Sequence, residues 1–522
     1  MNNSALKGNG SNLFPILMCC IILFMWIGCR GDGGDKDVDL QNQDNDVQYS
    51  FGIHPSSEDD YSYARDLGID FNRDGVYFVW DWVDPDRNGN FMFKNATASS
   101  TPDKPGGHVN YDNERQRLLS VEDIVLMNNV SPFRGGELLK GEFQNEEEKV
   151  IYQTFVEKMV ERYDGDSDLG CTQTNGIDCY NPGDKEYPAQ NLITILESNP
   201  IKYWQVCNQV TDVCSGPDCQ FNDLYAQKYA EVMKLTYRGI KTSCPDCEVL
   251  MAGDSAKELY PPVYNILMGE YIDIVDKHFF GAQGEYVNVP EEMDYLKYSL
   301  EEAGFDLDKL KFWISEIGTY SGDPVDDRDV PDALKKDPPY QTEQEQAQEL
   351  IKRYAVAFGY GIEKVLWAWG TKEGFSCNCC MFDYTGLIYD GNQESQSCDE
   401  NDPYDRGDGV KKLAYYTFKL MTQKLKGFTF VETIQNSNGT YVYKFVKDSI
   451  PVYVAWSENE ESLILTELSS NSVKITKAVP SYEFGDQVVD FNSAFASQTE
   501  DVSSGKITIN LDANPIFIEE NY

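Results

Sequence analysis

The sequence predicts an α/β fold in which a (β/α)₈ (TIM) barrel is followed by a small C-terminal β-sandwich. The chain has 522 residues, which is enough for two domains with sizeable cores. Between residues 47 and 427, short apolar runs alternate with amphipathic stretches, the pattern of repeated β-α units. From residue 428 to 522, short β-type runs follow one another without helical patterns between them.

The first region contains eight candidate strands with helical patterns between them, which favours a closed parallel barrel over an open sheet. In such a barrel, functional groups lie on the loops after the C-terminal ends of the strands. The candidate strands are 49–53, 69–73, 124–127, 201–207, 248–251, 272–278, 311–314 and 365–369, and the helical patterns are 146–162, 224–240, 291–303, 343–358 and 410–424.

The second region is predicted to be a β-sandwich because its β-type runs are separated by turn signals such as Asn438-Gly439 and Ser504-Gly505. We expect its strands at 428–434, 441–446, 452–456, 463–467, 473–477 and 507–511.

The N-terminus resembles an export signal. Lys7 is the only charge before an apolar run at 13–28, which is shorter than the ~20 residues of a membrane-spanning helix. The run ends in Gly28-Cys29, which resembles a bacterial lipobox, although Trp26 replaces the usual Leu. We therefore expect a signal peptide at 1–29, lipidation of Cys29 and a cell-surface or periplasmic lipoprotein anchored to the membrane. Simple secretion and an uncleaved anchor are the alternatives. Residues 30–46 have the composition of a disordered acidic tether.

The net charge of −43, from 87 acidic and 44 basic side chains, argues against nucleic acid as a partner because it repels phosphate backbones. Of the 14 cysteines, three lie in the signal segment, and the simplest expectation for the others is five disulfides with Cys207 free. The local sets are Cys171 and Cys179, Cys214 and Cys219, Cys244 and Cys247, and finally Cys377, Cys379, Cys380 and Cys398.

Two strand ends carry candidate chemistry. Residues 203–210 form an apolar strand that ends in Asn208-Gln209, and residues 312–318 form a second one that runs into Glu316. A carboxylate at the end of an apolar strand is costly unless it is paired or used. Glu316 is therefore a candidate nucleophile, and a structural Glu paired with an Arg is the alternative.

These segments resemble a clan of retaining glycosidases that carry the acid/base on strand four and the nucleophile on strand seven of the barrel. The resemblance is nearest to the families of β-xylosidases, α-iduronidases and related endoglycosidases with a C-terminal β-domain. The order and spacing of the matching segments are specific for the clan. They are 67–73, 201–209, 276–280, 314–318, 366–369, 386–390, 412–416 and 515–519.

The resemblance implies roles for single residues. Glu316 would be the nucleophile, Arg73 its electrostatic partner, and Asn208 a ligand of the sugar 2-hydroxyl. Trp369 would stack on the sugar ring. The same segments assign His278 and Trp367 to substrate binding.

Two positions depart from the clan pattern. Gln209 replaces the acid/base Glu, and Phe280 replaces a Tyr whose hydroxyl would contact the nucleophile. A glutamine has no proton to give, and a general acid supplies a rate factor of ~10²–10⁴.

Three hypotheses follow. The protein is a glycosidase or transglycosylase that needs little acid catalysis, as in plant thioglucosidases with the same exchange. Alternatively, another carboxylate on a mouth loop supplies the proton, the candidates being Asp212, Glu285 and Glu373. In the third hypothesis the protein is a non-catalytic, carbohydrate-binding surface lipoprotein. The expected partner in each is an oligo- or polysaccharide.

No cofactor or metal is expected. The runs 70–75 and 84–89 resemble the start of a calcium-binding loop, but neither is flanked by two clear helices. The cysteines at 377–380 do not match zinc-ligand spacing.

Overall fold

The computed structural model of the protein describes most of the region from residue 49 to residue 521. The predicted signal peptide, Cys29 and the tether lie outside the described residues. No helix in the described part of the chain is long and apolar enough to cross a membrane. The described ranges are 49–54, 61–73, 75–97, 107–119, 124–133, 141–166, 184–210, 223–254, 260–322, 340–374, 381–391 and 404–521.

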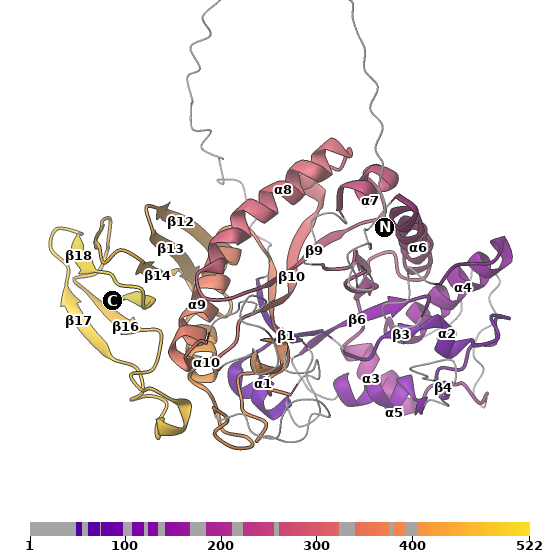
Figure 1. Ribbon diagram of the computed structural model, residues 1–522, viewed down its shortest axis with the longest axis horizontal. Helices are drawn as coiled ribbons and strands as arrows, with labels where there is room; N and C mark the ends of the chain where they lie inside the picture. The colour runs from indigo at the N-terminus through magenta and orange to yellow at the C-terminus, as the bar shows by residue number, and fades with distance from the viewer. Residues whose placement is uncertain are drawn as a thin grey trace, which may run out of the picture. The chain divides into compact units, whose positions relative to one another are not determined.

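Eight parallel strands of the described chain close into a barrel, in which β11 pairs with β1 and β2 pairs with β6 (Figure 1). Each of the eight predicted strands is present, and a short strand β3 (Phe78–Val79) adds to the end of β6. The barrel strands are β1 (Ser50–His54), β2 (Phe71–Arg73), β6 (Val125–Ser131), β7 (Tyr203–Val206), β8 (Glu248–Leu250), β9 (Ile274–Phe280), β10 (Lys311–Gly318) and β11 (Lys364–Ala368).

A helix follows every barrel strand, and two further helices, α2 and α5, lie before β6 and β7. The helices that follow the strands are α1 (Tyr61–Leu67), α3 (Tyr111–Leu119), α4 (Glu146–Tyr163), α6 (Asp223–Ser243), α7 (Tyr260–Leu267), α8 (Asn288–Glu302), α9 (Glu343–Gly359) and α10 (Leu413–Leu425). Between them lie α2 (Trp80–Val83), α5 (Gln190–Ser198), the small hairpin β4 (Ala96–Thr97) and β5 (His108–Val109), and the 3₁₀ turns η4 (Glu285–Val287), η5 (Leu307–Lys309) and η7 (Met381–Tyr384).

The long helices begin at residues that cap them. Thr342 accepts a hydrogen bond from the N–H of Glu345, whose carboxylate accepts one from the N–H of Thr342, so α9 starts with a complete capping box. Asn145 caps α4 by accepting a hydrogen bond from the N–H of Glu148 at 3.0 Å. Caps of this kind are typically worth about 1 kcal/mol each.

Side chains alternate between the two sides of the barrel wall. One set fills the barrel interior, and the larger set packs between the strands and the helices. On β7, Tyr203 lies inside and Trp204 outside. The interior side chains are Phe71, Met127, Leu250, Ile274, Trp313 and Leu366.

The C-terminal region is the predicted β-sandwich. A six-stranded antiparallel sheet packs one face against a two-stranded sheet, β15–β18, through a separate apolar core. Its other face contributes Phe445, Val454 and Phe517 to the core shared with the barrel helices. The strands are β12 (Phe430–Ser437), β13 (Thr440–Lys447), β14 (Ile450–Ser457), β15 (Ser462–Leu465), β16 (Ser472–Lys477), β17 (Ser497–Asp501), β18 (Ile507–Asn510) and β19 (Ile516–Asn521), with the 3₁₀ turn η8 (Gly485–Gln487).

Polar contacts also join the two regions. The indole N–H of Trp456 donates to the hydroxyl of Tyr286 at 3.0 Å, and this hydroxyl donates to Glu458 at 2.7 Å. Lys352 of α9 reaches the same carboxylate at 2.7 Å. The β-sandwich is therefore attached to the α8–α9 side of the barrel by a shared core and by a small polar network.

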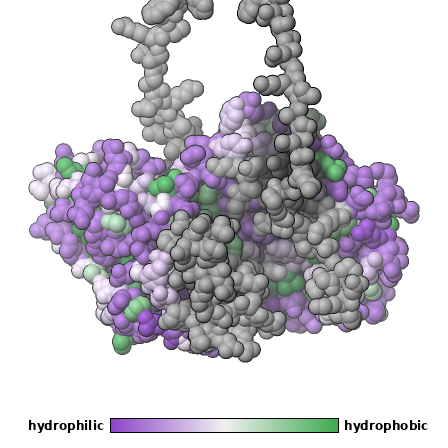
Figure 2. Space-filling view, viewed as in Figure 1, coloured by the Kyte–Doolittle hydropathy of each residue, from purple (hydrophilic) through white to green (hydrophobic). Residues whose placement is uncertain are grey.

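Among the cysteines of the described chain, Cys244 and Cys247 form a disulfide with an S–S distance of 2.00 Å, and Cys207 is free and buried. Both observations agree with the expected pairing. The other three local cysteine sets lie outside the described residues. The described surface in Figure 2 is mainly hydrophilic, as the acidic composition requires.

Candidate active site

The candidate site is centred on Arg73, the last residue of β2. Its side chain is fully buried and joins two other strands, β7 and β10, near their C-terminal ends. The guanidinium donates to Gln205 of β7 at 2.8 Å, to Asn208 at 2.6 Å and to the carboxylate of Glu316 on β10. The structure therefore brings together Arg73, Asn208 and Glu316.

A bulge in β10 directs Glu316 into the barrel. Trp313 pairs with Asp276 and Glu316 pairs with His278, so three residue steps on β10 match two on β9. The register against β11 shifts at the same place. Strict alternation from Trp313, whose side chain faces inward, would have turned Glu316 toward the helices. With the bulge, Ser315 and Glu316 both reach the site, a known function of bulges beside active sites.

Glu316 is fully buried and lies between a cation and two imidazoles. Besides Arg73, its carboxylate lies 3.1 Å from Nδ1 of His278 and 3.7 Å from Nε2 of His54. Burial and the charge of Arg73 hold the pKa of both histidines well below the usual range, so both rings are neutral at physiological pH. Arg73 therefore supplies the positive charge in direct contact with Glu316.

Asn208 and Gln209 directly follow β7, and both can line the site only if the strand ends or bends before them. The strand stops at Val206, and Cys207 and Gln209 have φ values of 63° and 42°. The backbone turns at both positions, and the N–H of Gln209 donates to the carbonyl of Gly253 at 3.0 Å. Asn208 and Gln209 are half-buried. Asn208 points to Arg73, and no hydrogen bond of the Gln209 side chain is found among the described residues.

A second polar layer lies beneath Arg73 and Glu316, and sequence reasoning missed it. The carboxylate of Asp276 accepts from the N–H and the hydroxyl of Ser315 at 2.8 and 2.5 Å, and from the amide of Gln205 at 2.5 Å. Burial raises the pKa of Asp276 to about 6, although Arg73 and the hydrogen bonds from Ser315 oppose the rise. Strand alternation is the signal that could have found Gln205 and Asp276, because both are polar residues at inward-facing positions.

A glycine after β8 makes this layer possible. A Cβ atom on Gly253 would lie 2.2 Å from Nε2 of His278 and 2.5 Å from the carboxylate of Asp276. No other residue fits without moving these side chains. Nε2 of His278 lies 3.2 Å from the hydroxyl of Ser315, so a continuous polar chain runs from Asp276 through Ser315 and His278 to Glu316.

Aromatic side chains form another wall of the site. Trp369, directly after β11, lies parallel to Phe280 at 6.4 Å and packs against His54 at 4.8 Å. Phe382 closes this cluster through an edge-on contact with Phe280 at 4.8 Å. Phe280 thus packs with other aromatic rings at the position where the clan has Tyr.

The expectation for Trp367 requires a correction. Its side chain is fully buried on the helix side of β11, and its indole N–H donates to the carbonyl of Thr385 at 2.9 Å. The residue at the next inward-facing position is Ala368. Because neighbouring strand residues face opposite sides, Trp367 belongs to the core and cannot line the same cavity as the end of β11.

The structure describes two of the three carboxylates predicted as alternative proton donors, which are Asp212, Glu285 and Glu373. Asp212 lies outside the described residues. Glu285 is exposed at the start of η4 and turns its carboxylate toward Gly281, and Glu373 forms an ion pair with Lys412.

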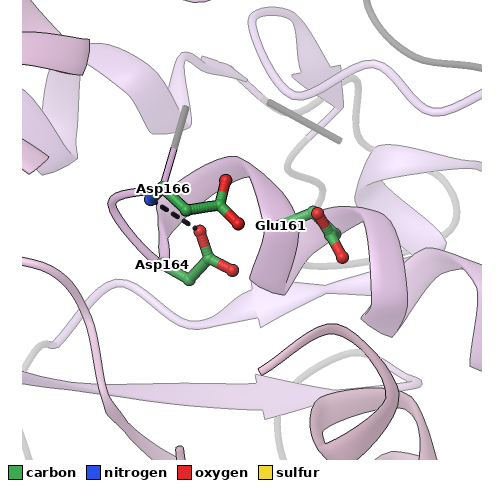
Figure 3. Close-up of side chains that lie close together, drawn as sticks. All are labelled: Glu161, Asp164 and Asp166. Atoms are coloured by element: carbon green, nitrogen blue, oxygen red, sulfur yellow. Dashed lines mark hydrogen bonds between the residues drawn. The ribbon is translucent and has the colours of Figure 1, made fainter. Parts of the chain in front are cut away.

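In the two runs that resemble calcium-binding loops, 70–75 and 84–89, carboxylate oxygens accept hydrogen bonds from backbone N–H groups. The carboxylate of Asp70 accepts from the N–H of Phe51, and that of Asp84 accepts from the N–H groups of Asn88 and Gly89. Two other groupings bring carboxylate oxygens within 4.8 Å of one another. Figure 3 shows the first, at the C-terminal end of α4, where Asp164 accepts from the N–H of Asp166. The groupings are Glu161, Asp164 and Asp166, and Glu373, Asp390 and Asp405.

No family model and no curated protein matches the chain. Among solved structures, a family 39 glycoside hydrolase from Bacteroides cellulosilyticus WH2 has a TM-score of 0.54 and 16% identity, over 92% of this chain and 82% of that chain.

Two further structures give the same result. A glucosidase from Croceicoccus marinus has a TM-score of 0.54 and 12% identity, over 91% of this chain and 96% of that one. A β-xylosidase from Caulobacter crescentus CB15 has a TM-score of 0.51 and 13% identity, over 90% and 95%. The chain has the fold of these glycoside hydrolases. The fold expected from the resemblance is confirmed, and the chemistry has to be argued from the residues of the site.

Proposed function

We propose that the protein binds oligo- or polysaccharides at the C-terminal end of its barrel and cleaves or transfers glycosyl groups by a retaining-type mechanism with altered proton donation. The observation that carries this proposal is Glu316. A bulge delivers it into the barrel, Arg73 pairs with its carboxylate, and the neutral ring of His278 lies 3.1 Å from it. Such a carboxylate is the group that attacks the anomeric carbon in retaining enzymes.

In the first step, an oxygen of Glu316 forms a bond to the anomeric carbon while the bond to the leaving oxygen breaks and its electron pair departs with that oxygen. Arg73 favours the ionised, nucleophilic form of Glu316. In the second step, water or a sugar hydroxyl attacks the same carbon, its proton passes to solvent, and Glu316 leaves as a carboxylate. The product is a free sugar or a new glycoside.

Gln209 determines which substrates can react. Its amide can donate a hydrogen bond to the leaving oxygen but cannot transfer a proton. The loss of a general acid costs a factor of ~10²–10⁴, or about 3–5 kcal/mol of transition-state stabilisation. Leaving groups that are stable as anions avoid most of this cost. The proposal therefore includes substrates with acidic leaving groups, or acceptor sugars that intercept a glycosyl enzyme.

The test is the dependence of kcat/KM on the acidity of the leaving group in a series of aryl glycosides. We expect the wild-type protein to cleave only activated members, Gln209→Glu to gain most on poor leaving groups, and Glu316→Gln to be inactive with both classes. Added azide should accelerate the wild type, because a small anion can attack the glycosyl enzyme without a general base.

The second candidate is a non-catalytic glycan-binding protein, which the replacements at Gln209 and Phe280 favour. It predicts that neither the wild type nor Gln209→Glu turns over any activated glycoside, with or without azide, while both still bind glycans in calorimetry. That outcome would refute the enzymatic proposal and leave the binding site in place.

For the N-terminus, the proposal is export and lipidation of Cys29, with attachment to the cell surface or the periplasmic face of a membrane. It rests on the apolar run at 13–28 and on Gly28-Cys29. Labelling with a radioactive fatty acid should mark the wild type and not Cys29→Ser. Equal labelling of both would exclude this site of lipidation.

A further inference from the structure

A groove of about 430 Å³ lies between α10 and the β-sandwich, away from the strand ends that carry Glu316. Its walls come from one face of the six-stranded sheet and from the outer side of α10, elements that are neighbours in Figure 1. Pockets of about 300–1,000 Å³ are typical of small-molecule sites, which often lie where two domains meet. The residues that matter are Lys424, Lys447, Lys474, Thr476, Phe491 and Phe495.

The groove exists because the barrel covers only part of this sheet face. On β14 and β19, Val452 and Phe517 are buried against the helices. Across the sheet, Glu519 pairs with Lys474, and Phe517 pairs with Thr476. Every residue of β17, the edge strand beyond them, is exposed. The sheet face is therefore open toward β17 and carries polar side chains there.

The groove is lined by three lysines, Lys424, Lys447 and Lys474, and two acids, Asp448 and Glu519, so its lining has a small excess of positive charge in a protein with a net charge of −43. Lys424 forms an ion pair with Glu519 at 2.5 Å, which neutralises both. Lys447 donates to the carbonyl of Gln423 at 3.1 Å, which leaves two of its three donors unused. Within the described part of the chain, neither Lys447 nor the exposed Lys474 forms an ion pair. Positive charge in a concave site attracts anions.

Thr476 supplies an independent indication of a ligand. It is 5% exposed and lines the groove, and its hydroxyl makes no hydrogen bond to any part of the chain that the structure describes. Leaving a buried polar group unsatisfied costs about 1–3 kcal/mol. Nearby, the rings of Phe491 and Phe495 pack at 5.4 Å, and Phe491 stays partly exposed. The groove thus combines cationic donors, a hydroxyl and an apolar aromatic face.

We infer that this groove binds an anionic sugar residue, carboxylated or sulfated, of a glycan chain. The ammonium groups of Lys447 and Lys474, which form no ion pair in the described part of the chain, and the Thr476 hydroxyl match the acid group and a neighbouring sugar hydroxyl. The part of the Phe491 ring not covered by the Lys419 ammonium, which lies 5.1 Å from the ring centroid, matches the apolar C–H face of a pyranose ring. The site is separate from Glu316 and performs no chemistry. It goes beyond the proposed function, because it gives the protein a second hold on an acidic glycan whether or not the barrel site cleaves it.

The test is calorimetric titration of the full protein with three probes: tetragalacturonate, a disulfated disaccharide and the neutral cellotetraose. The groove variant is Lys447→Ala/Lys474→Ala. The matched control is Lys477→Ala/Lys506→Ala, which removes the same charge from β16 and from the turn before β18, outside the groove. Thr476→Val is a third variant that keeps the charge.

We expect at least one anionic probe to bind the wild type and the control with the same affinity. Its affinity for the groove variant should be lower by a factor of about ten or more, because hydrogen bonds to a charged group contribute more than neutral ones. Thr476→Val should weaken binding by a smaller factor, and the groove variants should not alter any binding of cellotetraose. The probe that binds identifies the acid as carboxylate or sulfate.

Three results would overturn the inference. The first is that neither anionic probe binds the wild type, and the second is equal affinity in wild type and groove variant. The third is an equal loss in groove variant and control, which would indicate unspecific attraction. Repeating the titrations with Glu316→Gln separates the two sites, because this variant removes the proposed catalysis and should leave binding in the groove unchanged.

Discussion

Asp276 should make the stability of the protein depend on pH in a direction opposite to that of most paired carboxylates. Its carboxylate is fully buried beneath the site, and burial raises its pKa from 3.8 to about 6. The folded protein therefore binds this proton more tightly than the unfolded chain. The ionised form costs stability above pH 6, and the cost decreases as the pH falls from 6 toward 3.8.

The magnitude follows from the shift. A difference of about two pKa units at 1.36 kcal/mol each amounts to about 3 kcal/mol, accumulated at about 1.4 kcal/mol per pH unit inside that window. Asp276→Asn cannot take up the proton. Its free energy of unfolding, relative to the wild type, should therefore fall by about 2–3 kcal/mol between pH 7 and pH 4, because the wild type gains the proton and the variant does not.

Urea unfolding followed by tryptophan fluorescence at pH 7, 6, 5 and 4 measures this difference. Asp308→Asn, which changes an exposed carboxylate in η5 to the same amide, is the control, and its stability should follow that of the wild type. If the wild type and Asp276→Asn lose or gain stability in parallel over this range, Asp276 does not titrate as the buried network requires, and the reasoning is wrong.

Three other predictions concern single positions. Gly253→Ala should lower the free energy of unfolding by about 1–3 kcal/mol, seen as a lower melting temperature, because its Cβ would lie 2.2 Å from His278; an unchanged melting temperature would contradict this. Burial raises the pKa of Cys207 to about 12, so its thiol should resist iodoacetamide at pH 8 in the native protein and react in urea, as peptide mass spectrometry can show. Trp367→Phe should lower stability and leave glycan affinity unchanged, whereas Trp369→Ala should weaken glycan binding, and the reverse result would restore the original expectation for Trp367.

The barrel strands could be predicted because a parallel strand is buried on both sides and appears as a continuous apolar run. For the same reason β10 was predicted too short, at 311–314 instead of Lys311–Gly318. Ser315 and Glu316 interrupt the apolar run, and only the partners that satisfy them inside the barrel allow the strand to continue. A bulge is likewise invisible in hydropathy.

Two other elements were missed for different reasons. The helix α7 has buried apolar residues at helical spacing, but it begins with Tyr260-Pro-Pro, which suggests a turn, although prolines in a first turn leave the helix intact. The strand β17 is exposed at every residue and is ordered by pairing with β16. For β17, the neighbouring strand decides the structure and the local sequence does not.

Some residues of the site could be predicted from the sequence and others could not. Arg73 and Asn208 came from the resemblance and Glu316 also from its place in an apolar strand, and the structure brings the three into one network. Gln205 and Asp276 were missed because an isolated polar residue in an apolar strand has no visible partner in the sequence. Alternation from Tyr203 and Ile274 would have placed both inside the barrel, and the same rule would have placed Trp367 outside.

The buried charges bear on the choice between an enzyme and a binding protein. Keeping a buried ion pair is often no more stabilising than replacing it with apolar side chains of similar size, although removing one partner alone costs about 3–5 kcal/mol. Keeping the ion pair of Arg73 and Glu316 costs more free energy here, because the pair lies above a second buried carboxylate. This carboxylate is Asp276, whose ionised form is itself disfavoured by burial. Stability alone does not account for this arrangement. A site that only stacks on neutral sugars and hydrogen-bonds them would need the aromatic wall and Asn208. It would not need a carboxylate paired with a buried cation. The pair of Arg73 and Glu316 therefore supports the proposal of glycosyl transfer through Glu316, even with Gln209 in place of the acid.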